Sequence, residues 1–377
     1  MIIVNFFGRC MTKKINKDVY FKLLLLSVIS LLTNCATAPG QSVAEKPVFP
    51  PPPDEPRFYF QQSLTSSADV LQESDEAIFK RLVTGQTRSG IGMGKPFGVS
   101  VHQGRIFVTD TLKRMVMAFD RAAGKYIEIG TTRPGELYKP MGLDVDRQGN
   151  LYVCDATQKQ VVVFNRDGKY LRTMGDREMF SRPAGLTVDP DGKKVFVVDT
   201  GGVKSDWHRV VVLDAQSGEF LYNISKRGDK EGELNLPREA TIAADGNLYV
   251  VDGGNFRIQV FSQEGEFLRS FGGIGRRGGQ FSRPKGIGSD KAGNIYIADT
   301  AFGNFQIFNP EGQLLLAVGH RDSRHGPANF MLPAGLAVDE DGRVYMVDQF
   351  FKKIDVFRPA SLLESGGYFN TNKVSAK

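Results

Sequence analysis

The sequence predicts an all-β protein built as a six-bladed β-propeller, and three observations carry that prediction. Residues 236–272 contain four short runs of β-branched and aromatic residues separated by turn sequences, as expected for four antiparallel strands. This unit recurs at intervals of roughly 40 to 50 residues, which is typical of propeller blades. Six copies carry a Pro before the first strand and an Asp at the end of the second: Pro96/Asp110, Pro140/Asp155, Pro183/Asp199, Pro237/Asp252, Pro284/Asp299 and Pro333/Asp348. Six copies predict six blades.

The repeated residues resemble the NHL repeat family. The matching segments are MGLDVDRQGNLYVCD in repeat two, AGLTVDPDGKKVFVVD in repeat three, KGIGSDKAGNIYIAD in repeat five and AGLAVDEDGRVYMVD in repeat six. The resemblance extends over about 265 residues and implies a propeller of the NHL type, but it implies little about chemistry. Repeat four departs from it, because Glu239 stands where the other repeats carry Gly98, Gly142, Gly185, Gly286 and Gly335.

Residues 1–34 are expected to be a signal peptide, with either Met1 or Met11 as the start. Lysines precede the apolar run Leu23 to Leu32, which is too short to span a bilayer. The following Leu32-Thr33-Asn34-Cys35 resembles a bacterial lipobox, which implies lipidation at Cys35. Cleavage after Ala36-Thr37-Ala38, giving a soluble secreted protein, is the alternative. Because Cys35 is followed by Ala36 and not by Asp, we expect an exported protein anchored to the bacterial cell envelope at the outer membrane.

Charge and cysteine content narrow the classes of function. Removal of residues 1–34 takes away five cations and one anion, so the net charge falls from +6 to about +2 and does not indicate nucleic-acid binding. With Cys10 in the leader and Cys35 lipidated, Cys154 is the one remaining thiol, and we expect it to be a buried core residue.

The segments outside the repeats are expected to complete the domain. Residues 35–56 follow as the lipidated Cys and a Pro-rich spacer, and residues 57–359 as the propeller. Residues 57–64 (RFYFQQSL) supply the strand that the last blade lacks, with Tyr368-Phe369-Asn370 as the alternative. Residues 73–83 are predicted to form one short helix packed on the propeller, and residues 360–377 a carboxyl-terminal tail.

The longest connections all emerge on one face of the predicted propeller, and we expect binding there. They are Ser225 to Leu236, Gly272 to Arg283, Gly319 to Leu332 and the insertion Thr200 to His208. The segment 272–285 holds four cations and no acid. The candidate ligand-binding residues of this face are Arg276, Arg277, Phe281 and Arg283, extended by Lys226, Arg227, Arg321 and Arg324. They predict an acidic partner, namely a protein, a peptide or an anionic glycan of the envelope. A solvated loop without a ligand is the alternative.

A second function class is an enzyme, although the sequence favours a protein without catalytic activity. Some propellers that this sequence resembles are metal-dependent lyases or lactonases with a site in the central channel, but their ligand residues do not map onto this chain. The four histidines are scattered, and no metal or cofactor is expected. Glu239, with Trp207 and His208 beside it, marks a candidate site at the channel mouth. The six strand-ending aspartates are expected to accept hydrogen bonds from turn N–H groups and not to hold a metal.

Overall fold

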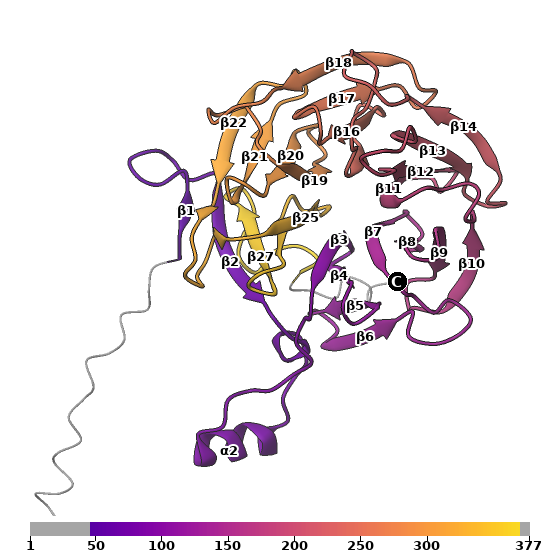
Figure 1. Ribbon diagram of the computed structural model, residues 1–377. Helices are drawn as coiled ribbons and strands as arrows, with labels where there is room; N and C mark the ends of the chain where they lie inside the picture. The colour runs from indigo at the N-terminus through magenta and orange to yellow at the C-terminus, as the bar shows by residue number, and fades with distance from the viewer. Residues whose placement is uncertain (1–45, 370–377) are drawn as a thin grey trace, which may run out of the picture. The chain divides into compact units, whose positions relative to one another are not determined.

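The computed structural model describes residues 46–369, and these contain six antiparallel sheets arranged around a central channel (Figure 1). Each sheet is one blade, and the first strand of each blade lines the channel next to the first strands of both neighbouring blades. The six-bladed propeller predicted from the repeats is therefore confirmed.

The strands follow the repeats in order. Blade one is β3 (Pro96–His102), β4 (Arg105–Asp110), β5 (Met115–Asp120) and β6 (Lys125–Ile129). Blade two is β7 (Pro140–Val145), β8 (Leu151–Asp155), β9 (Gln160–Phe164) and β10 (Tyr170–Met174). Blade three is β11 (Pro183–Val188), β12 (Lys194–Asp199), β13 (Arg209–Asp214) and β14 (Phe220–Ile224).

The second half of the chain repeats this arrangement. Blade four is β15 (Ala240–Ile242), β16 (Leu248–Asp252), β17 (Arg257–Phe261) and β18 (Phe267–Gly272). Blade five is β19 (Pro284–Ser289), β20 (Ile295–Asp299), β21 (Asn304–Phe308) and β22 (Leu314–Val318). A short parallel pair, β23 (His320–Arg321) and β24 (Asn329–Phe330), connects blade five to blade six.

Blade six combines both ends of the described chain. Its first three strands are β25 (Pro333–Val338), β26 (Val344–Asp348) and β27 (Lys353–Pro359), and its fourth strand is β2 (Phe58–Leu64), which pairs antiparallel with β27. The amino-terminal segment thus closes the propeller. Tyr368 and Phe369 of the alternative segment are not part of a strand, and the Phe369 side chain is fully buried in the core between blades six and one, while Asn370 lies outside the described residues.

The Pro-rich segment before β2 is not a free spacer over its described length, and this corrects the expectation from the sequence. Strand β1 (Val48–Phe49) pairs with β2 as a fifth strand on the outer edge of blade six. The Phe49 ring also meets Phe357 edge to face, with 5.9 Å between centroids. Apolar contact and backbone pairing therefore hold Val48 and Phe49 on the blade. The predicted signal peptide, Cys35 and the first part of the spacer lie outside the described residues.

Six hydrophobic cores fill the six interfaces between neighbouring blades. Each consists mainly of alternate strand residues, because side chains along a strand point in turn to the two faces of a blade. The connections between blades add one fully or almost fully buried side chain each: Leu137, Phe180, Leu234, Phe281 and Phe330. Cys154 is completely buried in the core between blades two and three, as expected from its sequence context.

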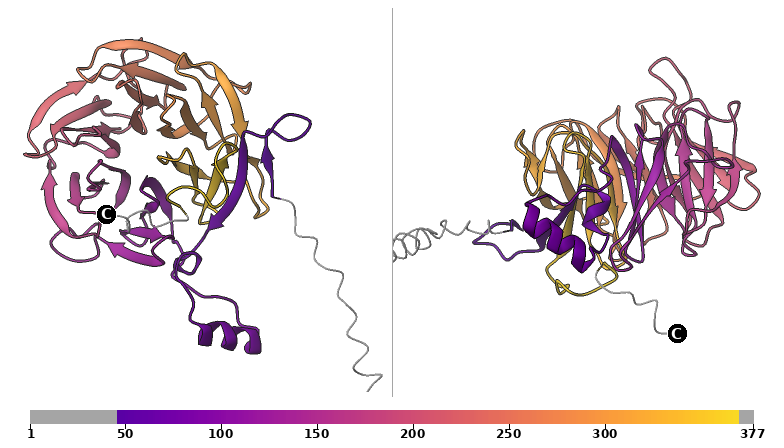
Figure 2. Two further views of the ribbon diagram at one scale, coloured as in Figure 1. Left: turned by 180° about the vertical axis from the view of Figure 1, so that it is seen from behind. Right: turned by 90° about the horizontal axis from the view of Figure 1, so that it is seen from below.

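The short helix forms, but its expected packing on the propeller was wrong. Helix α2 (Asp75–Thr84) begins where Ser74 Oγ accepts a hydrogen bond from the Ala77 N–H and ends at Gly85 in a left-handed conformation. None of its residues is buried, and Phe79 is 69% exposed. The left view of Figure 2 shows α2 standing off from the blades. The cores between blades are complete without it, since none of them includes an α2 residue. A short 3₁₀ helix, η1 (Ser67–Asp69), precedes α2, and no helix within residues 46–369 is long and apolar enough to cross a membrane.

Candidate functional site

The inner strands approach one another most closely at a layer of glycines near their amino-terminal ends. A Cβ atom on Gly335 would lie 2.5 Å from the Phe97 carbonyl oxygen, and one on Gly286 would lie 2.4 Å from that of Ala334. Real side chains are excluded at such distances, so the repeated glycine of the sequence is a packing requirement at the channel wall.

Glu239 occupies this glycine position in blade four and projects its carboxyl group over the inner strands of blades two and three. A Cβ on Gly185 would meet Glu239 Oε1 at 2.2 Å, and one on Gly142 would meet Oε2 at 3.0 Å. The carboxyl group therefore fills space that these two glycines leave open. Burial raises the pKa of Glu239 well above its usual value, and the nearby Asp144 adds to this effect.

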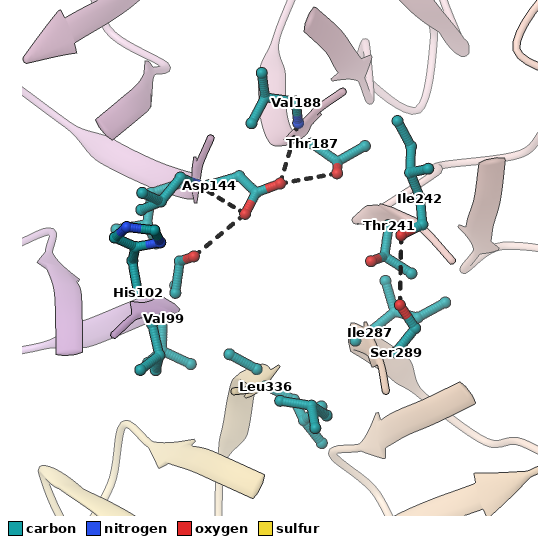
Figure 3. Close-up of a pocket in the computed structure, with 18 of the residues that line it drawn as sticks. Val99, His102, Asp144, Thr187, Val188, Thr241, Ile242, Ile287, Ser289 and Leu336 are labelled. Atoms are coloured by element: carbon teal, nitrogen blue, oxygen red, sulfur yellow. Dashed lines mark hydrogen bonds between the residues drawn. The ribbon is translucent and has the colours of Figure 1, made fainter. Parts of the chain in front are cut away.

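On one side of Glu239 the channel widens into a cavity of about 470 Å³, lined by residues from all six inner strands (Figure 3). It extends from the glycine layer to the turns that join the first and second strands of the blades, where His102, Lys291 and Glu340 stand. These turns lie on the face opposite the long connections. The polar side chains within the cavity include Ser100, Asp144, Thr187, Thr241 and Ser289.

Asp144 is the central acidic group of this cavity, and it links three blades. Its carboxylate accepts hydrogen bonds from Ser100 Oγ at 3.2 Å and from Thr187 Oγ1 at 2.9 Å (Figure 3). The backbone N–H groups of Val145 and Val188 donate at 2.8 and 3.0 Å. Burial raises the pKa of Asp144, although these four donors favour the charged form. The carboxylate braces the channel wall and faces the cavity.

The zinc and calcium ligand sets of some similar propellers do not map onto this sequence. Within residues 46–369, no three His, Cys, Asp or Glu side chains come together in a way that could hold a metal ion. His102 stands at the far end of the cavity, and burial lowers its pKa, partly offset by Glu340. Glu239 and Asp144 both line the cavity, and within the described residues neither carboxyl group is hydrogen-bonded to a histidine.

The six strand-ending aspartates have the structural role expected from the sequence. All six are completely buried. Asp110 shows the pattern, since its two oxygens accept hydrogen bonds from the N–H groups of Gly94, Lys95, Leu112 and Lys113. The carboxylates thus fix both the turn that follows them and the connection that leads into their own blade.

The connections held by these aspartates carry a set of cations, of which the sequence analysis named only Arg283 as a candidate. We call Lys95, Lys139, Arg182, Arg238, Arg283 and Lys285 the axial cations. Each stands within two residues of the start of an inner strand, so all six stand at the end of the channel on the face of the long connections, which we call the loop face. The sequence contains a signal for this set, because four of the six cations directly precede the Pro of their repeat.

Apart from Arg283, the cations predicted on the loop face fall into two groups. Arg276 and Arg277 are exposed, and within the described residues their guanidinium groups make no hydrogen bond or ion pair. The other four bind other parts of the chain. Lys226 pairs with Glu233, Arg324 with Asp322, Arg227 with the backbone of the insertion 200–208, and Arg321 with the Thr300 and Met331 carbonyls. Arg283 belongs to the axial cations.

Phe281 and His208 do not present side chains to a ligand, which corrects their predicted role. Phe281 is completely buried beside Phe308 in the core between blades four and five, where it is one of the five repeated core side chains of the connections. His208 is also completely buried. Its Nδ1 accepts a hydrogen bond from the Leu236 N–H at 3.2 Å, and its Nε2 lies 3.0 Å from the Gly202 carbonyl oxygen. His208 therefore fastens the insertion to the next connection.

Trp207 remains partly exposed, but it is not joined to Glu239. The Arg209 guanidinium lies over its indole ring at 4.3 Å from the centroid, and Arg209 in turn donates to the Met179 carbonyl. Trp207 thus packs with blade-three and blade-two connections, while the Glu239 carboxyl lies inside the channel. The expected cluster of Trp207, His208 and Glu239 does not assemble.

Comparison with known proteins agrees with this architecture. The model of the family DUF5128, described as a 6-bladed beta-propeller, matches residues 78–175. The NHL repeat-containing protein 3 of Mus musculus is 35% identical over 82 residues, which are 22% of this chain and 22% of that protein. Peptidyl-glycine alpha-amidating monooxygenase A of Xenopus laevis is 27% identical over 159 residues, which cover 39% of this chain.

The match spans only 16% of the length of that monooxygenase. Among solved structures, a gluconolactonase from Xanthomonas campestris superposes with a TM-score of 0.54 at 17% identity, covering 71% of this chain and 86% of the other. At this identity the likeness concerns the fold alone. The repeats, the six sheets and these matches together identify the chain as an NHL-type six-bladed β-propeller.

Proposed function

We propose that this protein is a binding propeller of the bacterial cell envelope, which recognises an acidic protein, a peptide or an anionic glycan through its loop face. The observation that carries the proposal is the pair Arg276 and Arg277, exposed in the connection between blades four and five without an acidic partner in the described chain. Guanidinium groups form paired hydrogen bonds with carboxylate, sulfate and phosphate oxygens, so two free ones favour an anionic ligand.

The base of this connection is fixed, which favours recognition over simple solvation. The Phe281 N–H donates to the Gly273 carbonyl at 2.8 Å, and the Gly275 N–H donates to the Phe281 carbonyl at 3.1 Å. Gln280 Oε1 accepts from the Arg277 N–H at 3.1 Å. Since the backbone on both sides of the two arginines is held, binding orders little besides their side chains.

The test is capture of partners from a solubilised envelope extract by the wild-type protein and by an Arg276→Glu/Arg277→Glu variant. We expect the variant to lose the captured partner with an unchanged melting temperature, and wild-type capture to weaken as salt rises. Lys125→Glu/Lys169→Glu is the matched control, because both lysines are exposed on the opposite face and the charge change is the same. Equal capture by the wild type and the Arg276/Arg277 variant contradicts the proposal.

We further propose that the protein is tethered by a lipid on Cys35, at the outer membrane. The short apolar run before Cys35 and the lipobox resemblance support this tether. Cys35→Ala is expected to move the protein from the membrane fraction to the soluble fraction and to remove the mass of the acyl chains. Unchanged fractionation together with an unmodified Cys35 contradicts the anchor.

A metal-dependent lyase or lactonase is the second candidate. It is favoured by the channel cavity, in which Asp144 and Glu239 are two carboxyl groups with raised pKa values. The described residues offer no ligand set for the metal. Elemental analysis separates the candidates, since stoichiometric zinc or calcium in the purified protein favours the enzyme.

A further inference from the structure

The six axial cations come together only in the folded protein, from five blades. Blades one, two, three and four contribute Lys95, Lys139, Arg182 and Arg238, and blade five contributes Arg283 and Lys285. Inner strands β3, β7, β11, β15 and β19 surround the channel side by side and start at the same end (Figure 1). Blade six contributes Leu332 and Ala334 at the equivalent positions, so the set has one apolar side.

The backbone under these cations is fixed before any ligand arrives. The N–H groups of Lys95, Lys139, Arg182 and Arg283 donate to the buried aspartates of their blades at 3.0, 3.1, 2.7 and 3.0 Å. The Arg238 N–H instead donates to the Val251 carbonyl at 2.9 Å. These bonds occupy the aspartate oxygens with backbone donors and leave the cationic side chains free to project.

Within the described residues, none of the six cationic groups forms an ion pair or a hydrogen bond to another side chain. Lys285 instead stacks its ammonium on the Phe97 ring at 4.9 Å from the centroid. This contrasts with Lys226, Arg227 and Arg324, the loop-face cations that pair with acids.

The cations are close enough to repel one another. Burial, together with the charges of Arg238, Lys95 and Arg283, lowers the pKa of Lys285 to about 8, while Asp348 acts in the opposite direction. Burial also lowers the pKa of Arg238, with further contributions from Arg182 and Arg283. A bound anion would relieve this repulsion, so the arrangement favours binding of negative charge.

The site has a floor at the glycine layer. The Glu239 carboxyl group lies there against Gly142 and Gly185, between the axial cations and the cavity. Burial raises its pKa, which favours the neutral acid at this position. A group that enters from the loop face therefore meets cations around it and a carboxyl group beneath it, separate from the cavity that opens on the opposite face.

We propose that the axial cations form a binding site for a multivalent oxyanion, such as the phosphate or sulfate ester of an envelope glycan, which enters along the propeller axis. Three guanidinium forks and three ammonium groups around one axis match a compact group with several oxygens better than a single carboxylate. The inference deepens the proposed function. It rests on that function for binding at the loop face and for the negative charge of the ligand. It depends on residues other than Arg276 and Arg277.

The test is calorimetric titration of the full-length protein with inorganic pyrophosphate at low ionic strength and pH 7. Wild-type protein is expected to bind one pyrophosphate, and Arg182→Gln/Arg283→Gln is expected to weaken binding by roughly tenfold or more. Lys113→Gln/Arg114→Gln is the matched control, since both residues are exposed on the loop face in the turn between β4 and β5. Should the double arginine variant fail to fold, Lys95→Gln/Lys139→Gln replaces it.

Absence of pyrophosphate binding to the wild type overturns the inference, as does equal binding by a folded axial variant. Competition by inorganic sulfate and by citrate distinguishes the two kinds of anion. Displacement of pyrophosphate by citrate but not by sulfate indicates a site for clustered carboxylates, and it overturns the proposal of a phosphate or sulfate ester. The two proposals fail separately. Pyrophosphate reports on the axial cations, and capture from envelope extract reports on Arg276 and Arg277, so loss of one signal with retention of the other assigns the failure.

Discussion

The Lys285 ammonium lies 4.9 Å from the centroid of the Phe97 ring, although Lys285 belongs to blade five and Phe97 to blade one. The side chain thus reaches past blade six at the end of the channel. Lys285 is partly buried there and lies among other cations, where an aromatic face is a favourable neighbour.

Lys285 is therefore expected to make stability depend on pH in the alkaline range. Its pKa falls from 10.5 to about 8 in the folded protein, so between these values the unfolded chain keeps a proton that the folded protein has lost. Stability contributed at this position rises with pH across that window, by up to about 3 kcal/mol. Urea unfolding of wild type and Lys285→Gln from pH 7 to pH 10 measures this effect. We expect the free energy of unfolding of the wild type to rise with pH relative to that of the variant. A difference that stays constant over this range contradicts the prediction.

Replacement of Gln61 is expected to weaken closure of the propeller. Gln61 Oε1 on β2 accepts a hydrogen bond at 3.0 Å from Nε of Arg343, whose side chain is completely buried in blade six. Gln61→Ala leaves a buried charged donor without this partner, so we expect a loss of about 1–3 kcal/mol in the free energy of unfolding. Gln148→Ala, at an exposed position, serves as the control and should change it by less than about 0.5 kcal/mol.

Replacement of Phe281 tests whether its buried ring anchors the connection between blades four and five. Phe281→Ala removes a completely buried ring and is expected to lower the free energy of unfolding by about 3–5 kcal/mol. The control is Phe350→Ala, because that ring is 53% exposed. Equal effects of the two substitutions in chemical denaturation would show that Phe281 is not a core residue.

Glu239 is expected to make the protein less stable as pH rises from acidic values. Its pKa is raised well above 4.5 in the folded state, so the folded protein holds a proton that the unfolded chain releases first. The stabilisation is complete at pH values below the unfolded pKa and is lost as pH rises through the folded pKa. Glu239→Gln should remove this dependence, whereas the exposed Glu231→Gln should retain it. Parallel pH profiles of wild type and Glu239→Gln would rule out a buried, protonated Glu239.

The sequence by itself determined the blades, because their signals are local. Alternating apolar residues and tight turns act over a few residues, and a Pro and an Asp mark each copy, so the strand order and the number of blades could be predicted. The role of Asp110 and its five counterparts followed from the same logic, since a carboxylate repeated at the same turn in every blade is explained by that turn. The missing fourth strand of blade six could be matched to residues 57–64 because an open edge needs a partner.

Only the tertiary structure decided which side chains face solvent and which meet around the axis. Phe281 and Arg277 lie four residues apart in one connection, yet one fills a core and the other is exposed, because that depends on packing against blade five. The apolar face of α2 predicted contact with the propeller, but cores already filled by strand residues leave it uncovered. Lys95, Lys139 and Arg182, the axial cations of blades one, two and three, lie 43 residues or more apart in the sequence. They become neighbours because closing six blades brings the starts of all inner strands to one end of the channel, a relationship that no local pattern encodes.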